Sequence, residues 1–154
     1  MDKAQTIEHL NRGIALEYGA VIQYNQYSNV LTGADRRIWR DLFKDMSEGA
    51  LKHAREVGFR VFSLGGIPTI EHTAIKQATD INEMLENSLE HERALVQAYT
   101  DALSHSEDNP AYRNFLEGMI EHEQEEVDEI RMYLKRIERA GATESKTKRM
   151  GKTG

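Results

Sequence analysis

Apolar residues recur at alternating intervals of three and four along four long stretches of this 154-residue chain. That interval places them on one face of an α-helix, so each stretch predicts a helix with one buried stripe. The predicted helices cover about 3–32, 35–64, 80–105 and 109–140. Only two prolines occur and charged residues reach 30%, which favours long helices over a sheet. We therefore expect an all-α fold, a four-helix bundle.

The connections between these helices differ in length. Asp80 followed by Glu83 is a capping-box pattern, and Asn109 followed by Pro110 is typical of a helix start. The first and third connections are tight, which predicts two antiparallel pairs. The second connection, residues 65–79, is long enough to span the bundle, so the second and third helices could run parallel.

The chain divides into a helical body and a short basic end. Residues 1–141 are predicted to form the bundle, with the last helix ending before Gly141. Residues 142–154 have no apolar stripe and carry a net charge of +3, whereas the body carries about −9. We expect a flexible tail that could contact DNA.

Composition excludes several classes of protein. Cysteine is absent, which rules out disulfides and thiol catalysis. No stretch of about 18 apolar residues and no signal-peptide pattern occurs, so we expect no membrane contact and a cytoplasmic location. A net charge of −6 argues against a general nucleic-acid surface.

Five ionisable residues interrupt the apolar stripes near the middle of their helices, at Glu17, His53, Glu92, Glu123 and Glu126. A single glutamate on a stripe is more often satisfied by neighbours than bound to a ligand. Four carboxylates in one buried layer, with no Lys or Arg at that level, are costly unless cations balance them. Two divalent ions would do so, and oxygen ligands with one imidazole suit iron or manganese better than structural zinc. These five residues are the predicted metal ligands; no other catalytic or cofactor-binding residue is predicted.

The remaining histidines and one tyrosine have simpler interpretations. We expect exposed or peripheral positions for His9, His72, His91, His105 and His122. Tyr24 lies two turns beyond Glu17 on the same face. It could donate a hydrogen bond to a ligand, take part in redox chemistry, or simply fill the core.

The sequence resembles the ferritin-like superfamily, and most of all its bacterioferritin branch. The resemblance covers about residues 7–137 and is carried by LNRGIALEYGAVIQYNQY, LKHA, IPTI, EMLENSLEHE and EHEQEEVDEI. It implies a di-iron site with one Glu from the first helix, Glu-x-x-His from the second, Glu from the third and Glu-x-x-His from the fourth. It also implies oxidation of Fe²⁺ by O₂ or H₂O₂, with storage of the product in many members.

Three positions depart from that pattern. The glutamate of the second helix is Ala50 here, and the histidine of the fourth is Glu126, so the carboxylate count stays at four. Glu48 could replace the missing glutamate only through a π-bulge near Gly49. The methionine that ligates haem in bacterioferritins is Leu51, so we expect no haem by that route.

The leading hypothesis is therefore a homo-oligomeric iron-binding protein, a dimer or a shell built from dimers, with an atypical ferroxidase centre. A DNA-associated mini-ferritin and a structural subunit with a degenerate site are the alternatives. An oxidase acting on an organic substrate is a further class, for which the sequence names no pocket.

Overall fold

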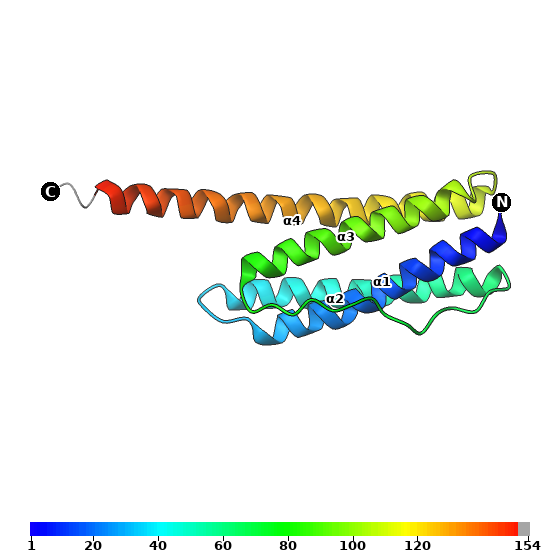
Figure 1. Ribbon diagram of the computed structural model, residues 1–154, viewed down its shortest axis with the longest axis horizontal. Coiled ribbons are helices and arrows are strands. Elements are labelled where there is room, and N and C mark those ends of the chain that lie inside the picture. The colour runs from blue at the N-terminus through cyan, green and yellow to red at the C-terminus, as the bar shows by residue number, and fades with distance from the viewer. Residues whose placement is uncertain (151–154) are drawn as a thin grey trace.

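The computed structural model describes the backbone of residues 1–150 and the side chains of residues 1–144. Four helices follow one another: α1 (Lys3–Val30), α2 (Arg36–Ser63), α3 (Ile81–Ser104) and α4 (Pro110–Met150). Figure 1 shows α1 beside α2 in one layer and α3 beside α4 in the other. Helix α1 also packs against α3, and α4 packs against α3. The predicted all-α four-helix bundle is confirmed.

Polar side chains start the helices where the sequence indicated. The carboxylate of Asp80 accepts hydrogen bonds from the backbone N–H groups of Asn82 and Glu83, at 2.9 and 3.1 Å. The side chain of Asn109 accepts in the same way from Ala111, at 3.1 Å. These bonds satisfy N–H groups that have no partner within the helix.

The end of α2 is a glycine cap. Gly65 has φ +88°, a left-handed conformation that glycine adopts without steric cost. Its N–H donates to Phe62 and that of Gly66 donates to Val61, which is the Schellman pattern. The chain then leaves α2 and runs back along the bundle as the long crossover, residues 65–80 (Figure 1).

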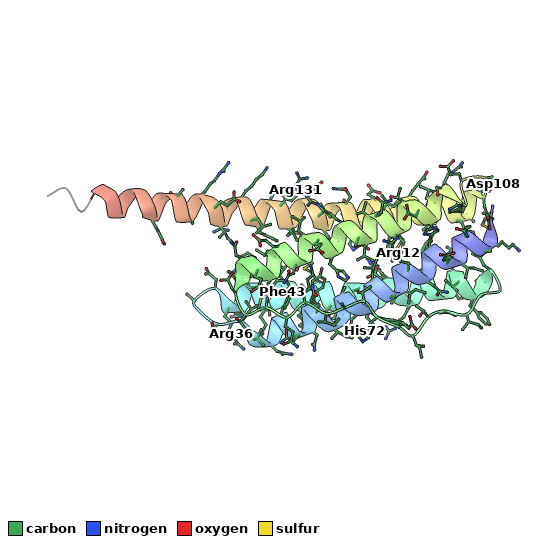
Figure 2. The ribbon with its side chains drawn as sticks, viewed as in Figure 1. Arg12, Arg36, Phe43, His72, Asp108 and Arg131 are labelled. Atoms are coloured by element: carbon green, nitrogen blue, oxygen red, sulfur yellow. The ribbon has the colours of Figure 1, made fainter. Side chains whose placement is uncertain are left out.

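Side chains of α1 hold the crossover against the bundle. The Asn11 amide donates to Ile67 O at 3.1 Å and accepts from Thr69 N at 2.9 Å. Further along, Gln23 accepts from Lys76 N at 2.9 Å. The crossover spans the bundle as predicted, so α2 and α3 run parallel. Figure 2 shows His72 on this segment, on the side of the molecule opposite Arg131 of α4.

Helix α4 is longer than predicted. It continues through Gly141 to Met150 and projects beyond the other three helices (Figure 1). The expectation that it ends near Ala140 is therefore wrong. One glycine costs a helix only about 1 kcal/mol, and Arg139, Ala140 and Ala142 around it are compatible with a helix. Residues 151–154 of the predicted tail lie outside the described residues.

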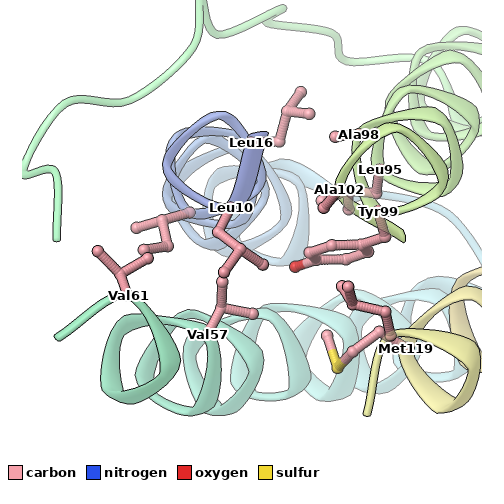
Figure 3. Packing of buried hydrophobic residues seen from close by; sticks show 11 residues of the cluster. Leu10, Leu16, Val57, Val61, Leu95, Ala98, Tyr99, Ala102 and Met119 are labelled. Atoms are coloured by element: carbon pink, nitrogen blue, oxygen red, sulfur yellow. The ribbon is translucent and has the colours of Figure 1, made fainter. Parts of the chain in front are cut away.

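The core has two apolar clusters. One contains Leu10, Val57, Leu95 and Leu116, and Figure 3 shows Tyr99 pointing from α3 toward the middle of this cluster. The other, toward the opposite end, consists of Ala20, Tyr24, Tyr27, Leu31, Phe43, Met46, Ala50, Ala78, Met84, Leu85 and Ile130. Among residues 1–150, none of the helices combines the length and apolar character that crossing a lipid bilayer requires.

Candidate metal centre

A layer of buried polar side chains lies between the two apolar clusters. Each helix contributes one member: Glu17 from α1, His53 from α2, Glu92 from α3 and Glu123 from α4. The three carboxylates are at most 3% exposed and His53 is 9% exposed. Four of the five predicted residues are thus brought together in the core.

Three of these residues form a compact group. His53 Nδ1 lies 2.9 Å from Oε1 of Glu123 and 3.4 Å from Oε1 of Glu17. Ligand atoms of all three residues lie within 4.8 Å of one another. The contact with His53 does not form an aligned hydrogen bond, so Oε1 of Glu123 is buried without a hydrogen-bond partner in the described structure. A buried acceptor of this kind is suited to a cation, and the donor set fits iron or manganese.

Two buried tyrosines, Tyr24 of α1 and Tyr99 of α3, hold carboxylates of the layer. The Tyr99 hydroxyl donates to Oε1 of Glu17 at 2.6 Å, and the Tyr24 hydroxyl donates to Oε1 of Glu92. Tyr24 therefore does contact a predicted ligand, in addition to filling the core. Hydrogen bonds from outer residues orient metal ligands and tune their affinity.

Burial and mutual repulsion disfavour the charged forms of the carboxylates in this layer. Burial raises the pKa of Glu17 from 4.5 to about 7, and raises that of Glu92 well above 4.5 with help from the charge of Glu123. Burial opposes the charge on His53, but the neighbouring Glu123 and Glu17 outweigh it and raise its pKa to about 10. Protonation therefore offsets part of the negative charge that a bound metal ion would balance.

A cavity of about 430 Å³ opens beside the layer. Over the described residues, no Cα atom of α2 comes within 8 Å of one of α4, and the cavity lies between these two helices. Its polar lining includes Glu17, Asp45, His53, Glu92, His122, Glu123, Glu126 and Glu129. Sequence periodicity missed Asp45, His122 and Glu129, because these residues lie off the apolar stripes.

Two of the three positions that depart from the family pattern, Ala50 and Glu126, line this cavity. Glu126 is half-buried in its wall, and burial together with Glu129 and Glu123 raises its pKa to about 7. Ala50 is 6% exposed and also lines the cavity. Helix α2 is regular through this region, and Glu48 faces solvent, 3.8 Å from Lys44. Glu48 therefore does not join the site.

His122 is exposed, as predicted, whereas His91 is half-buried. The ring of His122 stands edge-on to that of His53, with centroids 4.7 Å apart, and lines the cavity. The ring of His91 lies between α1 and the crossover, donates from Nε2 to Leu16 O at 2.8 Å, and has a pKa lowered by burial. His72 is exposed, as predicted, while His9 and His105 stack on each other, half-buried.

The fold and this layer define a four-helix bundle with a carboxylate and histidine centre. The ferritin-like domain family model matches residues 7–140, and the chain belongs to that family.

Two solved structures share this fold, and one curated protein is similar in sequence. A ferritin-like diiron-carboxylate protein from Bacillus anthracis is 29% identical, with a TM-score of 0.83 over 87% of this chain and 98% of that one. The bacterioferritin-related dodecameric thioferritin of Bacteroides fragilis has a TM-score of 0.84 at 21% identity, over 93% and 92%. A nutrient stress-induced DNA-binding protein of Synechococcus sp. is 24% identical over 85% of this chain and 81% of its own length.

Proposed function

We propose that this protein binds iron at the buried layer and oxidises Fe²⁺ there. The main support is the group formed by Glu17, His53 and Glu123, whose ligand atoms lie within 4.8 Å of one another. Oε1 of Glu123 is buried and makes no hydrogen bond, although it lies 2.9 Å from His53 Nδ1. Glu92 and Glu126 complete the proposed ligand set of four carboxylates and one imidazole. Manganese is a second candidate for the same donors.

Iron is the substrate in this proposal. Two Fe²⁺ ions each give up one electron, and the pair of electrons with two protons reduces O₂ to H₂O₂, or H₂O₂ to two waters. The protein supplies the ligands, and the buried tyrosines hold Glu17 and Glu92 in place. Oxygen ligands favour the ferric state, which supports sequestration of the product. We propose no haem, because Leu51 offers no ligand for it.

A double variant tests the proposal directly. Replacing Glu92 and Glu123 by Gln should abolish tight binding of Fe²⁺ or Mn²⁺, measured by equilibrium dialysis without oxygen. Glu86→Gln with Glu125→Gln is the matched control, because it removes the same two charges from exposed positions on α3 and α4. Unchanged binding in the first double variant would refute the proposal and favour a structural subunit with a degenerate site.

We also propose a homo-oligomer in the cytoplasm, either a dimer or a shell built from dimers that is smaller than 24 subunits. The proposal is supported by the oligomeric name of the Bacteroides relative and by exposed apolar side chains such as Phe59, Phe62, Ile67 and Ile70, which are between 67% and 92% exposed. The sequence after Gly141 has no apolar face for the fifth helix that 24-subunit shells normally add. Light scattering that gave a mass near 24 subunits would refute this.

DNA association is the second candidate function. It is supported by the name of the Synechococcus relative and by Lys146, Lys148, Arg149 and Lys152 near the end of the chain. Such contacts are salt-dependent and are multiplied in an oligomer. A gel-shift titration at several salt concentrations, comparing the full chain with one ending at Gly141, tests it: equal DNA binding by the two would exclude the basic end as the contact.

A further inference from the structure

The cavity beside the metal centre has a closed side and an open side. On the closed side, Tyr24 and Tyr99 each bond to a carboxylate oxygen of the layer. On the open side, α2 and α4 stay more than 8 Å apart between Cα atoms, and the cavity of about 430 Å³ fills the interval. A small molecule that reaches the centre would therefore do so between α2 and α4.

Ala50 leaves a place on α2 where no ligand atom is available. It lies one turn before His53, on the same face of the helix, and its methyl group lines the cavity. Gly49 beside it is also part of the lining, and a Cβ atom there would have nothing within 4 Å. Within one turn of His53, helix α2 thus presents no carboxylate to the centre; Asp45, its carboxylate in the cavity lining, lies eight residues before His53.

The rest of the lining suits a molecule with an apolar body. Ala20, Leu42 and Met46 supply carbon surface to the same cavity that holds the ligand group. The volume is within the range of pockets that take small organic molecules. A ligand with an oxygen-donor head and a short carbon chain would match both parts of the wall.

The net charge of the loaded metal centre indicates which head group a bound molecule would carry. Two ferric ions would carry two positive charges more than the four carboxylates Glu17, Glu92, Glu123 and Glu126 can balance, and a monoanion reduces that excess. Asp45 and Glu129 oppose an anion. Asp45 lies eight residues before His53, roughly 12 Å along α2, and Glu129 lies one turn beyond Glu126 and six residues beyond Glu123 on α4. The attraction at the centre acts over a much shorter distance.

We propose that the cavity beside Ala50 binds a small organic carboxylate, which coordinates the metal centre where α2 provides no carboxylate of its own. This inference rests on the proposed iron site. It assigns to the open side of the bundle a ligand of roughly two to six carbon atoms, with its chain against Leu42 and Met46.

The test uses the full chain loaded with Fe²⁺ in air and freed of excess iron. Azide colours ferric iron on coordination, so its absorption band reports the open position. Formate, acetate, propionate and butyrate are then titrated as competitors. Each added methylene should tighten binding about fourfold, because it buries carbon surface against the apolar wall. Leu42→Ala should weaken the binding of butyrate and leave that of formate unchanged.

Ala50→Glu should abolish the azide band, because the new carboxylate fills the open position. Ala111→Glu adds the same charge at an exposed site in the first turn of α4 and should keep the band. The chain-length series is measured on the unmodified protein, so it tests the proposal even if Ala50→Glu does not fold. Equal competition by all four acids, or no competition, would overturn it. A protein that retains no iron before azide is added would overturn the proposed function as well, and is recognised at that earlier step.

Discussion

Tyr99 of α3 donates a 2.6 Å hydrogen bond to Glu17 of α1, so a ligand on one helix is held by a side chain from another. Gly13, one turn before Glu17, makes this possible. A Cβ atom at Gly13 would lie 2.7 Å from Cε1 of Tyr99, which is closer than packed atoms approach. The position of Glu17 therefore depends on Gly13, which has no side chain, and on the Tyr99 ring, which packs in the space beside Gly13.

Removing the hydroxyl with Tyr99→Phe should weaken metal binding by about 10- to 100-fold, because outer hydrogen bonds orient the ligand. The free energy of unfolding should fall by about 1–3 kcal/mol, since Glu17 loses a buried donor. Titration with Mn²⁺ and urea unfolding measure the two effects. Tyr112→Phe is the control, because that hydroxyl donates to Arg60 O, 3.3 Å away, well outside the metal centre. Equal affinities in the two variants would contradict the role of Tyr99.

Gly13→Ala should destabilise the protein by about 1–3 kcal/mol, because the new methyl group displaces the Tyr99 ring. Gly118→Ala is the matched substitution on α4, where a Cβ atom would meet nothing within 4 Å. It should stabilise by about 0.5–1 kcal/mol through its better helix propensity. Urea unfolding of both variants should give changes of opposite sign.

The helix caps allow a second matched pair. Asp80→Ala should cost about 1 kcal/mol, because its carboxylate accepts two backbone hydrogen bonds at the start of α3. Asp35 precedes α2 but makes no such bond, so Asp35→Ala should change the free energy of unfolding much less. Thermal unfolding followed by circular dichroism compares them, and a larger effect at Asp35 would contradict the assigned caps.

The metal-free protein should lose stability as pH rises. Glu17 and Glu126 have pKa values raised to about 7 in the folded state, so the stability they contribute is complete below pH 4.5 and is lost as pH rises to about 7. The pKa of His53 is raised from 6.5 to about 10, so the stability that its protonation contributes is lost as pH rises from 6.5 to about 10. Unfolding temperatures measured from pH 5 to pH 9 should fall steadily. Mn²⁺ should reduce the slope, because it binds the deprotonated ligands. A rise in unfolding temperature over this range would contradict the assigned shifts.

The exchange at Ala50 and Glu126 should make the two iron positions unequal. The position near His53 and Ala50 should be the weaker, because α2 supplies only the imidazole, whereas Glu92, Glu123 and Glu126 give the other position three carboxylates. Ala50→Glu combined with Glu126→His should then give faster repeated Fe²⁺ oxidation, followed by stopped-flow absorbance. Many turnovers per subunit at a comparable rate in the unmodified protein would refute this.

Periodicity and caps were sufficient to predict the arrangement of the helices. The predicted ends of α1, α2 and α3 lie within two residues of the observed ones, because Asp80 and Gly65 act through local hydrogen bonds. The predicted end of α4 was wrong because Gly141 remains helical. A single glycine destabilises a long helix too little to end it.

The buried layer was predictable for a related reason. Glu17, His53, Glu92 and Glu123 interrupt an apolar stripe, and a stripe marks the face that is buried. The cavity was not predictable, because spacing along one helix does not determine the separation between two. Asp45, His122 and Glu129 line the cavity only because α2 and α4 stand apart at this level.

The attachment of the crossover to α1 has a consequence for cleavage of the chain. Glu71 and His72 are exposed. Before them, the backbone N–H of Thr69 is bonded to Asn11 of α1, and after them, that of Lys76 is bonded to Gln23 of α1. A protease that cuts between Glu71 and His72 would leave each half of the chain as a helical hairpin with its own strip of crossover still bound to α1. The nicked molecule should therefore remain assembled in native buffer and separate into two fragments only when it is denatured.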